Sequence, residues 1–163
     1  MRHSIVFASI ALLALPLRAQ HVHGEAKLDI AIDKEHLAIS LELPLDVAVG
    51  FERAPKTEKE KTALGTAQRI LADTALFLPT PAAACKGDTP KVVLPEFGKG
   101  GAEQHADIDA TYVFRCANPA ALKSVETAIF KSFKRLYRLE ARRAGPSGQG
   151  AARLTPKNPV FAW

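Results

Sequence analysis

The chain has 163 residues, with 22 lysines and arginines against 17 aspartates and glutamates, a length typical of one domain with its own hydrophobic core. Removing residues 1–19, a predicted leader, takes away Arg2 and Arg18 and leaves 20 basic against 17 acidic residues. This near-neutral balance argues against nucleic-acid binding, and the lack of Gly-x-Ser-x-Gly, His-Glu-x-x-His and phosphate-loop motifs leads us to expect no enzymatic activity.

Residues 1–19 have the pattern of a cleavable signal peptide. Arg2 gives a charged start, residues 5–15 form an apolar run, and Ala19 is a small residue at the expected cut. The run is shorter than the roughly 20 apolar residues that cross a bilayer, so a membrane anchor is the weaker alternative. We therefore expect an exported protein with one domain over residues 20–163 and no membrane span after cleavage. Cleavage after Gln20 is the alternative cut.

Alternating apolar residues predict a β-hairpin over residues 26–43, with its turn at residues 33–35. A short helical turn is expected at residues 45–51. Thr57 and Glu60 have the spacing of a capping box, which predicts that a helix starts there and carries an apolar stripe to Leu71. The glycine-rich residues 98–104 are expected to form a loop, and residues 108–116 alternate again as a strand.

The last third of the chain is harder to interpret. Residues 122–129 fit a strand or a helix, whereas residues 139–144 predict a strand that residues 151–154 could pair with across a turn at 145–150. Lysines and arginines cluster between residues 131 and 143, and we interpret them as a solvated basic face. These elements predict one α+β domain, a mainly antiparallel sheet with two or three helices on one face.

Cys85 and Cys116 are the only cysteines of the chain. In an exported protein an even, small count favours a disulfide over two free thiols. A metal site is the weaker alternative, because the Cys-x-x-Cys spacing typical of zinc sites is missing.

Histidines and carboxylates share faces of two predicted strands. Alternate residues of a strand point to one side, so His21, His23 and Glu25 lie together, as do His105, Asp107 and Asp109. If the two strands are neighbours, four or five nitrogen and oxygen ligands converge, a set that suits zinc. The alternative is that they are ordinary polar residues on an outer strand face. A further histidine, at position 36, lies beside a turn and is interpreted as a surface residue.

The block His-Val-His-Gly-Glu-Ala at residues 21–26 resembles the zinc-regulated periplasmic proteins of the ZrgA type from Gram-negative bacteria. The likeness continues through residues 43–46 and 50–55, resumes at residues 105–116 and 145–156, and ends at Trp163. It implies a periplasmic zinc-binding protein that assists zinc uptake, with an envelope zinc transporter as partner.

The resemblance also implies the disulfide between Cys85 and Cys116 and makes His21, His23 and His105 the ligand positions to carry over. The sequence departs from the family in one place. Members often carry a tract rich in histidine and acidic residues before the His-Ala-Asp block, whereas residues 98–104 contain no histidine. This departure predicts weak zinc binding, or transfer of the metal rather than storage.

We therefore expect a zinc site in which three histidines donate neutral nitrogens and Glu25 or Asp107 supplies negative charge. The main alternative is an envelope module that binds a protein partner without metal, through the late basic segment and the aromatic C-terminus. A narrower alternative follows from cleavage after Gln20, which would leave a free amine on His21 with His23 in third position, an arrangement that favours copper(II).

Overall fold

The computed structural model describes residues 24–97 and 106–163. The predicted signal peptide, the expected loop at residues 98–104, and His21, His23 and His105 lie outside these ranges. In the described part of the chain, no helix is long and apolar enough to cross a membrane.

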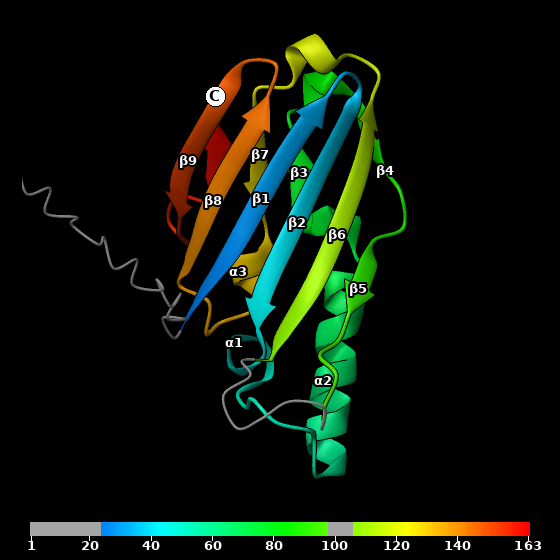
Figure 1. The fold of residues 1–163 in the computed structure, drawn as a ribbon, viewed down its shortest axis with the longest axis vertical. Helices are drawn as coiled ribbons and strands as arrows, with labels where there is room; N and C mark the ends of the chain where they lie inside the picture. Colours follow the sequence, from blue (N-terminus) through cyan, green and yellow to red (C-terminus); the bar gives the residue numbers. More distant parts are fainter. Residues whose placement is uncertain (1–23, 98–105) are drawn as a thin grey trace, which may run out of the picture.

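One arched, mixed β-sheet forms the first layer (Figure 1). Its strands lie in the order β4 (Cys85–Gly87), β6 (Asp107–Cys116), β2 (His36–Pro44), β1 (Glu25–Asp33), β8 (Arg138–Gly145) and β9 (Gly148–Leu154), and β5 (Lys91–Val93) also pairs with β6. The paired strands are antiparallel except for β1 and β8, which run parallel. The expected mainly antiparallel sheet is confirmed, and the parallel pair is a feature that local periodicity does not reveal.

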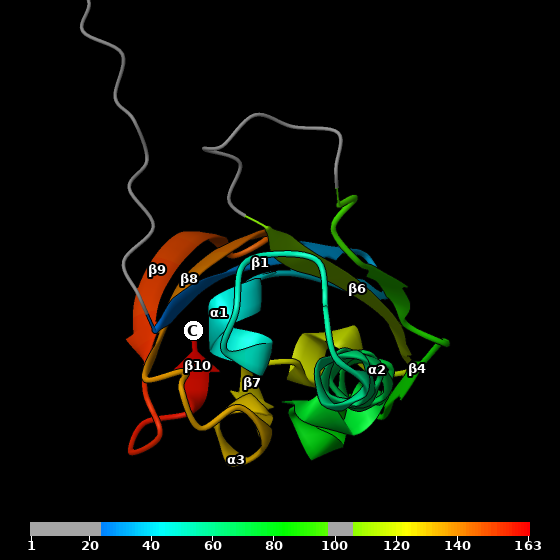
Figure 2. The same ribbon diagram turned by 90° about the horizontal axis from the view of Figure 1, so that it is seen from below.

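The second layer lies on the concave side of the arch (Figure 2). It contains helices α1 (Leu45–Val49), α2 (Glu58–Leu71) and α3 (Ile129–Ser132), and a small sheet in the order β10 (Val160–Ala162), β7 (Ser124–Thr127) and β3 (Phe77–Pro79). Three 3-10 turns, at Thr74–Leu76, Pro81–Ala83 and Pro119–Ala121, connect these elements. The α+β class with its helices on one face of the sheet is thus confirmed.

Local sequence signals account for the clearest elements. The hairpin of β1 and β2 follows the predicted alternation, with Leu28 and Ile30 buried and Lys27 on the other face. At the start of α2, Thr57 Oγ1 accepts from the Glu60 amide at 3.2 Å, and the Glu60 carboxylate accepts from the Thr57 amide at 3.1 Å. The Arg53 guanidinium and the amides of this capping box lower the pKa of Glu60 to about 2.

The structure resolves the ambiguous late segments. Residues 122–129 contain β7 followed by the start of α3, and the three apolar residues of the stripe, Phe130, Phe133 and Leu136, are all buried. The turn expected at residues 145–150 is shorter, because Gly145 and Gly148 are already paired as the last residues of the β8–β9 hairpin. Gly148 has a φ of +92°, a left-handed conformation that lets the chain reverse within two residues.

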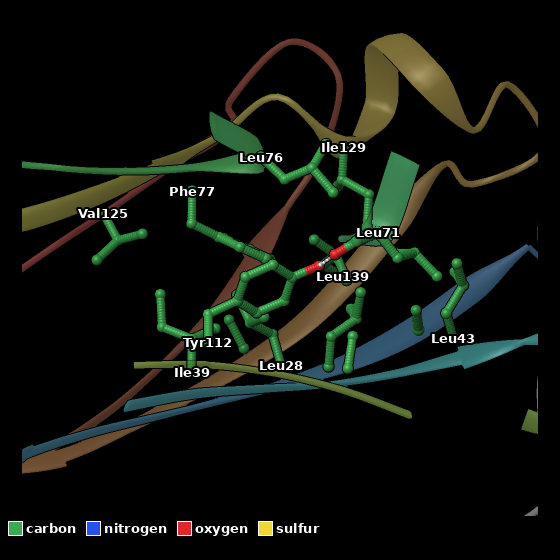
Figure 3. Packing of buried hydrophobic residues seen from close by; sticks show 14 of the residues in the cluster. Leu28, Ile39, Leu43, Leu71, Leu76, Phe77, Tyr112, Val125, Ile129 and Leu139 are labelled. Atoms are coloured by element: carbon green, nitrogen blue, oxygen red, sulfur yellow. Dashed lines mark hydrogen bonds between the residues drawn. The ribbon is translucent and has the colours of Figure 1, made fainter. Parts of the chain in front are cut away.

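Tyr112 connects the two layers at the centre of the core (Figure 3). It projects from β6, is fully buried, and donates its hydroxyl to the carbonyl oxygen of Leu71 at 2.7 Å, at the last residue of α2. Its ring meets Phe77 edge to face at 4.7 Å between centroids. Burial raises the pKa of Tyr112 well above its ordinary value, because the anion would lose its hydration.

The Cys85–Cys116 disulfide is present and confirms the expected pairing. The two residues lie directly opposite each other on β4 and β6, so the bond fastens the short edge strand to the sheet. Closing a loop of this length contributes about 3–4 kcal/mol in the chain-entropy account.

Tyr112→Phe should lower the free energy of unfolding by about 1–3 kcal/mol, since the buried Leu71 carbonyl loses its donor. Urea denaturation measures the change. The matched control is Tyr137→Phe, which alters the other tyrosine of the chain at a position 48% exposed and should stay within about 0.5 kcal/mol of the parent. Equal losses in the two variants would contradict the role of the hydroxyl.

The stability of the parent protein should also fall in alkali because of Tyr112. The unfolded phenol releases its proton near pH 10, whereas the folded one keeps it to higher pH, so the native state binds more protons. The contribution of this group is therefore complete below about pH 10 and lost as the pH rises above it. Tyr112→Phe should flatten the slope of unfolding free energy against pH above pH 10, and an unchanged slope would refute the assignment.

Candidate metal site

Two of the five predicted ligands, Glu25 and Asp107, lie in the described part of the chain. Glu25 is the first residue of β1 and Asp107 the first residue of β6. Each precedes a buried residue, Ala26 and Ile108, so both carboxylates are on the outer face of the large sheet, away from the helices. The alternation in the sequence predicts this placement correctly.

The two strands are not neighbours, because β2 lies between them. Lys27 pairs with Glu42, and continuing this register by two residues brings Glu25 level with Pro44, which is itself the partner of Asp107. Glu25 and Asp107 are therefore at the same end of the same face, about 10 Å apart at the backbone. The expectation that the two strands are neighbours is therefore wrong, and the carboxylates of Glu25 and Asp107 are one strand further apart, with Pro44 between them.

Glu25 is already engaged by a cation. Arg138, on β8, donates to its carboxylate in a partly buried ion pair, and its guanidinium also lies 3.0 Å from Glu140. The hydrogen bond that Arg138 donates to Glu25 raises the pKa of Arg138 above its ordinary value. A metal ion would therefore have to compete with this guanidinium for Glu25.

A second pair of carboxylates lies beside this end of the sheet. Glu42 and Asp109 are direct partners across β2 and β6 on the outer face, and Lys27 Nζ lies 2.6 Å from Glu42 on the other side. Burial, and secondarily the negative charge of Glu42, raise the pKa of Asp109. Alternation in the sequence predicts that Asp109 is on this face but does not single out Glu42, since only the strand register reveals that the two are opposite each other.

The described segments that directly follow His23 and His105 in the chain begin at this same end of the sheet. In the chain His23 directly precedes Gly24, and His105 directly precedes Ala106. The Gly24 carbonyl accepts from the Tyr137 amide at 3.0 Å, and the Ala106 carbonyl accepts from the Leu45 amide at 2.8 Å. Gly24 and Ala106, the residues that follow the two histidines in the chain, are thus each held to the fold by a backbone hydrogen bond.

Only a glycine fits at position 24. Its φ is +82°, and a Cβ there would overlap the ring of Tyr137. This explains why the His-x-His-Gly-Glu block has glycine between its second histidine and its carboxylate. Within residues 24–97 and 106–163, no group of three or more histidine, cysteine, aspartate or glutamate side chains could hold a metal ion, so the expected set depends on the histidines outside these ranges.

The late basic cluster is not a uniformly solvated face. Arg138 pairs with Glu25, and Arg142 pairs with Asp29 at 2.9 Å, which neutralises two of its charges. Arg143 is only 5% exposed, so the interpretation as a solvated face is wrong for this residue. It points inward because it continues the alternation of the buried residues of β8.

A protein-family model described as ZrgA family zinc uptake protein matches residues 20–163. No curated protein sequence matches the chain. The match begins directly after the predicted cut at Ala19 and includes every described residue.

Glu42→Gln should lower the pKa of Asp109 toward its ordinary value, because the opposing negative charge disappears. Carboxyl ¹³C NMR titration of the aspartates measures the shift. Glu140→Gln removes a charge from the same face but on β8, and should leave the pKa of Asp109 unchanged. An Asp109 that titrates identically in the parent and in Glu42→Gln would rule out this electrostatic coupling.

Proposed function

Because this chain belongs to the ZrgA family of zinc uptake proteins, we propose that it is a periplasmic zinc-binding protein that assists zinc uptake, with zinc as its cargo. The observation that carries the proposal is that Glu25 and Asp107 share one end of the outer face, where the chain leads to His23 and His105. Imidazole nitrogens combined with a carboxylate form a ligand set that zinc prefers.

In the proposed site His21, His23 and His105 donate neutral nitrogens and Asp107 supplies negative charge. Glu25 is the alternative source of negative charge, and there a metal ion would have to displace the guanidinium of Arg138. The nearby Glu42–Asp109 pair favours cation binding as well, because a divalent ion would relieve the repulsion between these two carboxylates. Three histidines and one carboxylate would complete the four-coordinate geometry common for zinc.

The location outside the cytosol rests on separate observations. Residues 1–19 have the charged start, apolar run and small final residue of a signal peptide, and the family match begins at residue 20. The Cys85–Cys116 disulfide is typical of an oxidising compartment. Together they favour export to the periplasm, where an envelope zinc transporter would be the partner.

Isothermal titration of the oxidised mature protein with zinc tests the proposal. We expect saturable binding at neutral pH and weaker binding at pH 5.5, because histidine protonates near pH 6.5 and only the neutral ring is a ligand. The double variant His23→Gln/His105→Gln should bind more than about tenfold more weakly, since even loss of a ligand's hydrogen-bond partner costs about 10–100-fold.

The matched control is His36→Gln. His36 is a partly exposed histidine at the start of β2, 3.6 Å from Glu35 and at the other end of the strand from Pro44. Its replacement should leave zinc affinity unchanged. Equal affinity of the double variant and the control would refute the proposed ligands, and a parent protein that takes up no zinc at either pH would refute the function.

A further inference from the structure

A pocket lies at the opposite end of the large sheet, beside the β1–β2 and β8–β9 turns. Its volume is about 320 Å³, and the residues around it include Ile32, Lys34, Leu122, Lys123, Ser147 and Trp163. Two lysines and no aspartate or glutamate side chain are among the described residues that line it. Asp33 and Glu35 flank Lys34 in the chain, but neither lines the pocket.

A third cation lies directly behind the wall of this pocket. Arg143 is 5% exposed, and its Nη1 donates to Ser147 Oγ at 3.0 Å. Its Cζ lies 5.0 Å from the centroid of the Trp163 ring, a cation–π contact. Ser147 and Trp163 both line the pocket, so the guanidinium is one side chain away from its interior.

The charge of Arg143 has no anionic partner in the described part of the chain. No ion pair joins its guanidinium to a carboxylate there, and its buried Nε has no hydrogen-bond partner. An arginine cannot shed its proton in a protein, and a buried unpaired charge is strongly unfavourable. Arg138 and Arg142 on the same strand each form an ion pair with a carboxylate, so Arg143 is the exception among the arginines of β8.

We propose that this pocket binds a small organic anion carrying two or three carboxylates. The ammonium groups of Lys34 and Lys123 supply two positive charges in the lining, and Arg143, which does not line the pocket itself, adds a third charge from behind Ser147 and Trp163. The Trp163 ring and the apolar side chain of Leu122 offer surface for the carbon skeleton. A volume near the lower limit of about 300–1,000 Å³ for ligand pockets fits a ligand of this size.

Trp163 makes the pocket directly observable, because it is the single tryptophan of the chain. The experiment titrates the metal-free mature protein with propane-1,2,3-tricarboxylate at constant ionic strength and follows tryptophan emission. We expect a saturable change with the parent protein. Lys34→Gln and Lys123→Gln should each weaken binding by about tenfold, the effect of losing one charge-assisted contact. Arg143→Met should weaken it as well, because it removes the positive charge behind Ser147 and Trp163.

The matched control is Lys59→Gln, which removes one exposed positive charge from α2, away from the pocket, and should bind like the parent. Because Arg143→Met removes a buried group and could unfold the chain, the two exposed pocket lysines carry the decisive comparison.

No saturable response from the parent, or equal affinities in the pocket-lysine variants and Lys59→Gln, would overturn the proposal. Sulfate or inorganic phosphate binding as tightly as the tricarboxylate would overturn the assignment to carboxylates.

Discussion

The parallel pairing of β1 with β8 is the constraint on which the rest of the structure depends. On one side β1 meets β2, its neighbour in the chain, and on the other it meets a strand 113 residues away. This junction attaches the β8–β9 hairpin to the sheet, brings Arg138 to Glu25 at one end, and places Arg143 beside the β1–β2 turn region at the other. Both candidate sites therefore depend on the same pair of strands.

Burial stabilises this junction, and charge specifies its register. Leu28 and Ile30 of β1, with Leu139 of β8, are at most 2% exposed and form part of the continuous core. The exposed pair of Asp29 and Arg142 contributes little to stability, since solvent screens it, with typical values of about 0–1 kcal/mol. A slip of one residue would expose the buried set and separate both ion pairs, so the two patterns require the same register.

The sequence predicts elements whose signals are local. Alternation located the hairpin and β6, and the spacing of Thr57 and Glu60 located the start of α2, because each signal involves residues close in the chain. Pairings between distant strands leave no such signal. The insertion of β2 between the two carboxylate-bearing strands, and the opposition of Glu42 and Asp109, could not be read from local periodicity.

The burial of Arg143 does have a local signal in the sequence. Counting it with its basic neighbours predicted a solvated face, whereas the alternation of Leu139, Ala141 and Arg143 places it on the buried side of the strand. The position of a charge in the pattern of a strand is thus more informative than its membership in a cluster. The same observation weakens the alternative that this basic segment binds a protein partner. Of its three arginines in β8, Arg138 and Arg142 are ion-paired and Arg143 is buried.

The two candidate sites are at opposite ends of β1, and this separation makes them independent. Glu25 begins the strand and Asp33 ends it, a distance of about 25–30 Å along an extended chain. That distance exceeds the Debye length of about 8 Å at physiological ionic strength, so the charge of one ligand barely affects binding of the other through solvent. The zinc site joins a face that gathers carboxylates, whereas the pocket gathers cations around a tryptophan. A protein that bound zinc but no carboxylate, or the reverse, would therefore identify which of the two charge patterns has a ligand and which is only a feature of the fold.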